Sequence, residues 1–205
     1  MKISIATPKA IKYACIKFHY AKCVPSVQYG FNIYNDSDEW CGVICYGNGA
    51  TPNMPGSFGL CSGEALELVR VALNGKQGHG NTSKAVAMSL RYLHEINPLV
   101  KMIVSYADLD QDHAGTIYQA TNWIYLGCMN KGSRGAFIVN GKKTHPRTIG
   151  SAGGVQSIEW VREHLDKNAT IFYTKGKHKY VFCYDKRLRK KYLKQALPYP
   201  KKDEI

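Results

Sequence analysis

The chain has 205 residues, 44% of them hydrophobic, which indicates a folded globular protein rather than a disordered one. The seven cysteines contain no C-x-x-C pair, which argues against a structural zinc site and against a disulfide framework. No apolar run approaches the roughly 20 residues that span a membrane. The first residues also lack the pattern of a signal peptide, so we expect a cytoplasmic protein that does not enter membranes.

The positive charge is concentrated in the last third of the chain. The whole sequence has 28 Lys and Arg against 15 Asp and Glu, a net charge of +13. Residues 1–130 carry 10 basic and 9 acidic side chains, whereas residues 131–205 carry 18 and 6, a net charge of +12. Because Lys and Arg release counterions when they neutralise phosphates, this segment is a candidate nucleic-acid surface. A solvated basic face is the alternative.

The first half of the chain predicts one helix and three strands. Helical spacing of apolar residues after a proline predicts a helix over residues 8–18. Alternating patterns over 27–35 and 39–47, joined by an acidic turn, predict an antiparallel hairpin. A long loop over 47–63 rich in Gly, Pro and Asn then leads to a strand over 65–73.

The second half alternates between helices and strands. A Gly-rich turn over 75–83 precedes a helix over 84–96 and a strand over 100–109. The remaining predicted elements are, in chain order, a short helix over 113–121, a strand over 122–127, strand-like pieces in 135–143, a loop over 145–154, an amphipathic helix in 155–165, a strand over 179–184 and a basic helix over 186–197.

The Gly-rich turn lies between a strand and a helix, where backbone N–H groups and the helix dipole favour phosphate binding. Its sequence is neither a complete G-x-G-x-x-G motif nor a Walker loop. It resembles the acyl-CoA pyrophosphate loop of GNAT acyltransferases, Q/R-x-x-G-x-G/A. We therefore assign donor binding to this turn, to the strand before it and to one later residue: Val71, Leu73, Gln77, Gly80, Thr82, Ser83 and Asn122.

The segment GTIYQATNWIYLG, residues 115–127, is rich in aromatic side chains. GNAT proteins commonly carry L-Y-x-x-x-G-F, and Ile117, Tyr118, Asn122 and Trp123 are in register with that motif. The resemblance implies that Tyr118 donates a proton to a leaving group and that Trp123 packs in the core. Asn122 replaces the glycine of the motif. Core packing is the alternative role for Tyr118.

Several segments together resemble the phage Mom family of GNAT-fold DNA-modifying proteins, from about residue 18 to residue 200. They are FHYAKCVP, GVICYGNGA, ELVRVAL, VSYADLDQDHAGTIYQATNWIYLG, HPRTIGS and LPYPK. The resemblance implies an α/β, GNAT-like fold with a mixed, mostly antiparallel central sheet flanked by helices. We expect a single domain, 1–205, with a basic C-terminal extension from about residue 131.

Family membership would imply conversion of the 6-amino group of adenine in the phage's duplex DNA to a carbamoylmethyl form, which protects that DNA from host restriction. The amine of adenine is a poor nucleophile, so the reaction needs a base and a flipped, desolvated nucleotide. Asp108 is the predicted base, with His113 or His19 in reserve and Tyr20 as a neighbour. A helix cap is the alternative role of Asp108. Two further acidic residues are expected to be solvated, Asp110 and Asp112.

The predicted nucleic-acid contacts begin with Arg70, which could instead pair with Glu67. The others lie in the basic last third: Arg147, Lys175, Lys177, Lys186, Arg187, Arg189, Lys190 and Lys191. We expect double-stranded DNA with a flipped adenine as partner, and tRNA if it carries the donor. A homodimer is also compatible with the sequence.

The donor is either acetyl-CoA-like or glycyl-tRNA-like, because simple acyl transfer leaves an amide whereas the family's product has a CH₂ on the ring-side nitrogen. We predict no metal site. Iron is a secondary alternative, since several residues are ligand types for it but show no H-x-[DE] pattern: His19, Tyr20, Asp108, Tyr118 and His145.

Two other classes of function fit the sequence. One is a GNAT acyltransferase that acts on RNA or protein amines, which would share the donor residues and differ in the acceptor groove. The other is a non-catalytic DNA-binding protein. A methyltransferase is disfavoured, because the chain has neither a Gly-rich S-adenosylmethionine turn nor the D/N-P-P-Y/F motif.

Overall fold

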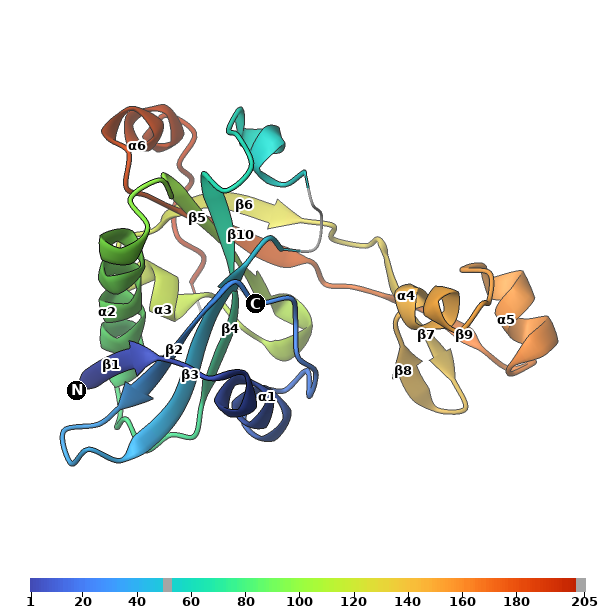
Figure 1. The fold of residues 1–205 in the computed structure, drawn as a ribbon. Coiled ribbons are helices and arrows are strands. Elements are labelled where there is room, and N and C mark those ends of the chain that lie inside the picture. Colours follow the sequence, from blue (N-terminus) through green and yellow to red (C-terminus); the bar gives the residue numbers. More distant parts are fainter. Residues whose placement is uncertain (50–52, 202–205) are drawn as a thin grey trace. The chain divides into compact units, whose positions relative to one another are not determined.

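The computed structural model describes residues 1–49 and 53–201. The chain divides into two compact units, both drawn in Figure 1. Unit 1 contains residues 1–106, 115–127 and 179–199, and unit 2 contains residues 107–114, 128–178 and those from 200 onward.

A seven-stranded sheet forms the centre of unit 1, with strand order β1-β2-β3-β4-β5-β10-β6 (Figure 1). Strands β1 to β4 pair antiparallel with their neighbours, and β4 pairs parallel with β5. The strands are β1 (Lys2–Ile5), β2 (Tyr29–Tyr34), β3 (Trp40–Gly47), β4 (Ala65–Leu73), β5 (Met102–Asp108), β6 (Ile124–Met129) and β10 (Lys177–Cys183). The fold is thus a mixed, mostly antiparallel α/β sheet, as the sequence predicts.

Two helices cover opposite faces of this sheet. Helix α1 (Pro8–Lys17) packs Ala14 and Cys15 against Val43 and Cys45 of β3. The Tyr46 hydroxyl of the same strand instead lies 2.6 Å from Ser89 Oγ, in helix α2 (Asn81–Ile96). Because successive side chains of a strand point to opposite faces, α1 and α2 lie on either side of the sheet. None of the described helices combines the length and the apolar character needed to cross a bilayer.

Most elements of unit 1 agree with the sequence prediction. The hairpin of β2 and β3, the strand over 65–73 and the helix over 8–18 are confirmed. Helix α2 begins three residues earlier than predicted, at Asn81, after Gly80 in the left-handed conformation. The loop over 47–63 contains a short 3-10 helix, η1 (Pro55–Phe58), and its residues 50–52 lie outside the described residues.

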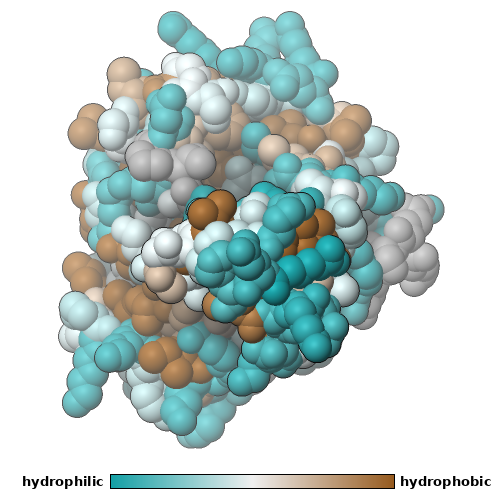
Figure 2. All heavy atoms as spheres, turned by 90° about the vertical axis from the view of Figure 1, so that its right-hand side faces the viewer, coloured by the Kyte–Doolittle hydropathy of each residue, from teal (hydrophilic) through white to brown (hydrophobic). Residues whose placement is uncertain are grey.

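Unit 2 contains a three-stranded sheet of order β8-β7-β9. Its core is formed by Phe137, Ile149, Val161 and Ala169. The face that carries helix α5, seen in Figure 2, is mainly hydrophilic with small separate hydrophobic areas. The elements of this part of the chain are η2 (Leu109–Gln111), β7 (Arg134–Val139), β8 (Lys142–Thr144), α4 (Pro146–Ser151), α5 (Ile158–His164) and β9 (Thr170–Tyr173).

Besides the short 3-10 helices η1 and η2, three elements were not predicted from the sequence: β1, β9 and α4. Strands β1 and β9 have four residues each, too few to give a clear alternating pattern. The predicted loop over 145–154 contains helix α4, which begins with Pro146. The His145 ring accepts a hydrogen bond from the Arg147 backbone N–H at 3.1 Å and so caps this helix. Histidine is not among the residues preferred at that position, so the sequence did not signal a helix start.

The structure does not show the basic C-terminal extension as a separate element. Residues 131–178 belong to unit 2, whereas 179–199 return to unit 1. There β10 lies between β5 and β6, and helix α6 (Lys186–Leu193) packs Tyr192 into the hydrophobic core. The expected extension also includes residues 202–205, which lie outside the described residues. The basic helix α6 therefore has a buried side, formed by Tyr192.

Gly115 should be essential for the stability of unit 1. It precedes helix α3 (Thr116–Gln119) with φ +78°, and a Cβ there would lie 2.5 Å from the Tyr180 ring. We expect Gly115→Ala to lower the free energy of unfolding by about 2–4 kcal/mol, since backbone strain and overpacking add. Urea unfolding measures this loss.

Gly59→Ala is the matched control for this substitution. Gly59 has a similar φ of +73° but no heavy atom within 4 Å of the added Cβ. It therefore tests the backbone strain alone, about 1 kcal/mol. Equal losses in the two variants would contradict a role of the aromatic contact.

Candidate active site

Strands β4 and β5 diverge after a short paired stretch. They pair in parallel only where Ala65–Glu67 meets Met102–Val104. Beyond that point β4 continues to Leu73 and β5 to Asp108. The register of β3 and β4 also shifts between Cys45 and Tyr46, a β-bulge of the kind often found beside active sites. The divergence leaves backbone groups of both strands without their usual ladder partners.

Tyr118 of α3 lies at the start of this divergence. Its side chain is buried, with 7% exposed. Its hydroxyl is 2.8 Å from Ser105 Oγ, and Ser105 Oγ is 3.0 Å from the Leu68 carbonyl oxygen of β4. Burial raises the pKa of Tyr118 to about 12, against the Ser105 hydrogen bond, which lowers it. Tyr118 is therefore protonated at neutral pH and has a proton to donate.

Aromatic rings hold Tyr118 in place. The centroids of Trp123 and Tyr180 lie 5.0 and 5.2 Å from the centroid of the Tyr118 ring. Trp123 is fully buried, which agrees with the predicted packing role. Its indole N–H has no hydrogen-bond partner among the described residues. The aromatic segment therefore supplies both a core and, at Tyr118, a polar group that reaches the divergent strands.

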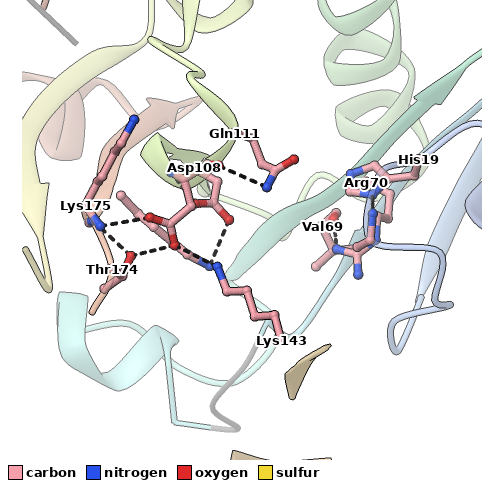
Figure 3. A network of polar contacts seen from close by, with 12 residues as sticks. His19, Val69, Arg70, Asp108, Gln111, Lys143, Thr174 and Lys175 are labelled. Carbon is pink, nitrogen blue, oxygen red and sulfur yellow. Dashed lines mark hydrogen bonds and ion pairs between the residues drawn. The ribbon is translucent and has the colours of Figure 1, made fainter. Parts of the chain in front are cut away.

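His19 and Tyr20 follow helix α1, and their ring centroids are 4.3 Å apart. Burial is the main cause that raises the Tyr118 pKa, and the electrostatic effect of Tyr20 adds to it. The Arg70 guanidinium donates to the Val69 carbonyl at 2.6 Å and to Cys23 Sγ at 3.4 Å. Figure 3 draws His19, Val69 and Arg70. The role of Arg70 in nucleic-acid binding stays a prediction.

Glu67 is a further candidate site residue. From the sequence it was expected only as a possible partner of Arg70. It is the last residue of β4 that pairs with β5. Its negative charge contributes to the raised pKa of Tyr106, after burial, and to that of Tyr118. The Glu67 carboxylate thus acts electrostatically on Tyr118, which makes Glu67 a candidate proton acceptor. The pairing of β4 with β5 shows that Glu67 lies where the two strands separate, which the sequence alone did not indicate.

The Gly-rich turn before α2 is held together by its own contacts. Gly78 and Gly80 have φ values of +84° and +76°. Gln77 Nε2 donates to Thr82 Oγ1 at 3.0 Å, so two predicted residues meet. No side chain caps the start of α2, which leaves backbone N–H groups of its first turn for an anion. Val71 and Leu73 pair with Ile44 and Gly42 in the β3–β4 ladder.

A groove of about 590 Å³ runs along α2. It includes two predicted donor-binding residues, Ser83 and Asn122, together with Phe182 of β10. Lys84 and Arg91 also line it, and their seven-residue spacing places them on one face of the helix. These two cations were not predicted as site residues, although their spacing is visible in the sequence. The lining also contains one acidic residue, Glu95, so the two cations leave the groove with an excess of positive charge.

The acidic segment of unit 2 is largely structural. Asp108 accepts a hydrogen bond from the Asp110 backbone N–H at 3.0 Å and caps η2, the alternative considered from the sequence. Its Oδ2 is 4.0 Å from Lys177 Nζ. The His113 backbone N–H donates to the Asp108 carbonyl at 3.2 Å. The roles of Asp108 and His113 in proton transfer stay predictions.

Asp110 is not solvated as predicted, since its side chain is only 9% exposed. It accepts hydrogen bonds from Lys143 Nζ at 3.2 Å, Thr174 Oγ1 at 3.0 Å and the Lys175 backbone N–H at 2.8 Å (Figure 3). Burial raises its pKa, but these bonds outweigh burial and the net pKa is lowered. The prediction failed because these partners lie far away in the sequence.

The predicted nucleic-acid residues differ in their surroundings. Lys175 pairs with Asp112 at 2.9 Å, and Lys177 faces Asp108. Arg147 lies on α4. Helix α6 carries the other predicted residues, including Arg187 and Lys191. Its outer face forms a shallow depression of about 400 Å³, which is lined by Lys186, Arg189, Lys190, Leu193 and Lys194.

A metal site has no support from the side-chain arrangement. In residues 1–49 and 53–201, no group of three or more His, Cys, Asp or Glu side chains is placed to hold a metal ion. His145, which was considered as a possible iron ligand, caps helix α4. The iron alternative therefore has no ligand group in the described part of the chain.

Comparison with solved structures identifies the fold as that of GNAT acetyltransferases. A spermidine N-acetyltransferase SpeG chimera from Vibrio cholerae and hSSAT matches with a TM-score of 0.51 and 10% identity, over 94% of this chain and 99% of that chain. Ribosomal-protein-S5-alanine acetyltransferase from Vibrio fischeri matches with a TM-score of 0.50 and 11% identity, over 90% and 93% of the two chains. At these identities the likeness concerns the fold.

The family is shown by sequence comparison. The profile of the Mom protein family matches residues 1–201, and the chain belongs to this family. It is also 25% identical over 167 residues to the methylcarbamoylase mom of Escherichia phage Mu, which covers 78% of this chain and 67% of that protein. The resemblance proposed from the quoted segments is thereby confirmed.

Replacement of Asp110 should weaken unit 2. We expect Asp110→Asn to lower the free energy of unfolding by about 1–3 kcal/mol near pH 7, because a buried, hydrogen-bonded carboxylate is lost. The folded-state pKa of Asp110 is lowered, so its contribution is present above the unfolded pKa of about 3.9 and is lost as the pH falls through the folded value. The difference from wild type should therefore shrink near pH 3.

Asp112→Asn is the control, because Asp112 is 76% exposed and its pair with Lys175 lies at the surface. It should leave the unfolding midpoint close to wild type. Urea unfolding of the three proteins at about pH 7 and about pH 3 gives the comparison. A loss for Asp110→Asn that does not depend on pH would contradict the role of its charge.

Proposed function

We propose that this Mom-family protein is a phage DNA-modification enzyme that acylates the 6-amino group of adenine in duplex DNA on the way to a carbamoylmethyl form. Such a modification would protect the phage DNA from host restriction nucleases. The observation that carries the proposal is the protonated Tyr118 at the point where β4 and β5 diverge, within a GNAT fold. The relative from phage Mu is named a methylcarbamoylase, which agrees with this substrate chemistry.

The donor is proposed to be an acyl group on a nucleotide-bearing carrier. The uncapped start of α2 offers N–H groups to a phosphate, and Lys84 and Arg91 add positive charge along the adjoining groove. An acyl-CoA and an aminoacyl-tRNA both contain an adenosine nucleotide, so both share the chemistry that this groove recognises. The acyl group would then reach the divergent strands beside Tyr118.

Two kinds of side chain carry the transfer step in this proposal. Tyr118 protonates the leaving group of the carrier as the acyl bond breaks. A carboxylate takes the proton that the adenine amine releases on attack. Glu67 is the carboxylate that acts electrostatically on Tyr118, and Asp108 remains the base predicted from the sequence. His19 and Tyr20 are proposed to contact the flipped base.

The chemistry of the product favours a glycyl group as the donor. Simple acyl transfer leaves an amide on the 6-amino nitrogen, whereas the carbamoylmethyl form has a CH₂ on the nitrogen bonded to the ring. A transferred glycyl group carries its own amine, which can attack ring carbon 6 through a five-membered intermediate. The original amino nitrogen is expelled and becomes the carboxamide. The product is an isomer of the glycyl amide, so no oxidant is required.

Helix α6 is the proposed DNA-binding surface. Its inner side is fixed by Tyr192 in the core, while its outer side presents Lys186, Arg189 and Lys190. The lysines of unit 2 that were predicted to bind nucleic acid face carboxylates instead, which reduces their net attraction for phosphate. The positive charge of α6 is therefore the better candidate for phosphate contacts.

Removal of charge from α6 should weaken DNA binding at all sequences. We expect the combined substitution Lys186→Gln, Arg189→Gln and Lys190→Gln to lower the affinity. The slope of log affinity against log salt should fall by about one for each lost phosphate contact. Fluorescence anisotropy with labelled duplex DNA measures both quantities.

A control variant removes the same charge from α1, by Lys9→Gln, Lys12→Gln and Lys17→Gln. These lysines are exposed on a helix that has no proposed DNA contact. The α1 variant should keep the salt slope of wild type. An unaltered slope in the α6 variant would show that α6 is a solvated surface.

Tyr118→Phe tests the reaction itself. In cells that express this variant, the fraction of modified adenine in DNA should fall by about ten- to a thousandfold, the effect of losing one proton donor. Tyr46→Phe is the matched control, since Tyr46 is also buried and its hydroxyl also contacts a serine. Mass spectrometry of nucleosides measures the fraction. If Tyr118→Phe modified DNA normally, Tyr118 would have only a packing role. If the modification were found only in RNA or protein, an acyltransferase that acts on RNA or protein amines would be favoured instead.

A further inference from the structure

Ser105 occupies the first position of β5 beyond the stretch paired with β4. The paired stretch ends at Glu67 and Val104, and Ser105 comes next in the chain. Its side chain is 1% exposed, and its hydroxyl lies 3.0 Å from the carbonyl oxygen of Leu68, the residue that follows Glu67 on β4. A side chain therefore takes over, for one residue, the link that the backbone ladder no longer makes.

The same hydroxyl also contacts the hydroxyl of Tyr118, with the two oxygens 2.8 Å apart. Ser105 has one proton, and the Leu68 carbonyl can only accept a hydrogen bond. When Ser105 donates to Leu68, the proton between the two hydroxyls must therefore come from Tyr118. When Tyr118 has lost its proton, Ser105 can turn its own proton from Leu68 to the phenolate.

This second arrangement is a hydrogen bond to a charged oxygen, which is stronger than one between neutral groups. The rings of Trp123 and Tyr180 pack against the ring of Tyr118, whereas Ser105 contacts its hydroxyl. Trp123 in particular leaves its own N–H without a partner in the described residues. Ser105 is thus placed to hold the reactive end of Tyr118 in both of its protonation states.

We propose that Ser105 is a positioning residue that directs the Tyr118 hydroxyl at the divergence of β4 and β5 and stabilises the phenolate left after proton donation. The inference rests on the proposed function in so far as Tyr118 is the proton donor. In the transfer, the Tyr118 proton passes to the leaving group and Ser105 donates to the phenolate. The proton that the carboxylate took from the attacking amine then passes to the phenolate and restores the phenol.

Ser105→Ala should lower the fraction of modified adenine by about ten- to a hundredfold, the effect of losing a hydrogen bond to a charged group. Ser105→Thr keeps the hydroxyl and should recover most of the activity. Ser89→Ala is the matched control, because Ser89 Oγ also contacts a buried tyrosine, Tyr46 at 2.6 Å, and a backbone carbonyl, Val86 at 2.8 Å. It should modify DNA as wild type does.

A double-mutant cycle separates positioning from a general loss of structure. In the Tyr118→Phe background, Ser105→Ala should cause no additional loss, because Ser105 acts through the Tyr118 hydroxyl. An equal loss with and without that hydroxyl would overturn the proposal. The proposal would also be overturned if Ser89→Ala lowered the fraction of modified adenine as much as Ser105→Ala.

A spectroscopic measurement keeps the test independent of turnover. Difluorotyrosine placed at position 118 ionises at lower pH than tyrosine, and its fluorine resonance reports the ionisation. Removal of the Ser105 hydroxyl should raise the ionisation pH, whereas Ser89→Ala should not change it. Groups that also face Tyr118 are the same in all variants: Tyr20, Tyr46, Glu67 and Tyr180.

An unchanged ionisation pH in Ser105→Ala would overturn the proposal even if the wild-type protein modified DNA. If the wild-type protein produced no modified base, the proposed function would fail. The fluorine titration would then still decide whether Ser105 controls the protonation of Tyr118. Failure of the proposed function and failure of this inference are therefore distinguishable.

Discussion

The separation of β4 from β5 is the constraint on which the candidate active site depends. Two parallel strands that pair over three residues and then part leave backbone groups to be satisfied by other partners. One hydroxyl, that of Ser105, provides such a partner for Leu68 and contacts the buried Tyr118. Sheet geometry and proton chemistry are thus connected through a single side chain.

The positive charge of the last third has more than one structural role. Part of it is neutralised within unit 2, where Lys143, Lys175 and Lys177 face the carboxylates of residues 108–112. Another part lies on the outer face of α6, a helix anchored in unit 1 by Tyr192. A net charge of +12 in the sequence therefore overstates the charge that is free to attract DNA.

Local patterns in the sequence predicted the elements that have strong periodicity. The hairpin of β2 and β3, strand β4 and helix α1 follow from alternating or helical spacing of apolar residues. The site is harder to predict, because its contacts join distant positions: Ser105 meets a residue 37 positions earlier and another 13 positions later. The same reason explains the error at Asp110, whose partners are 33 to 65 residues away.

The resemblance to known motifs indicated candidate site residues, which the spacing of apolar residues could not do. It identified Tyr118 and the turn around Gln77 and Thr82, and the structure places these residues at the divergent strands and at the start of α2. It did not single out Lys84, Arg91 or Glu67, although Glu67 is the first residue of the quoted segment ELVRVAL. Their positions become meaningful only when the groove and the strand pairing are known.

The central proposal is that a glycyl group is transferred to the 6-amino group of adenine and that the product then rearranges. Its most direct test is isotopic. DNA whose adenine carries labelled nitrogen at the 6-amino position is modified in cells that express the protein, and the modified nucleoside is fragmented in a mass spectrometer. The account predicts that the label is found in the terminal carboxamide, because the glycyl nitrogen has replaced it on the ring. Label that remains bonded to the purine ring would contradict the rearrangement of a glycyl group.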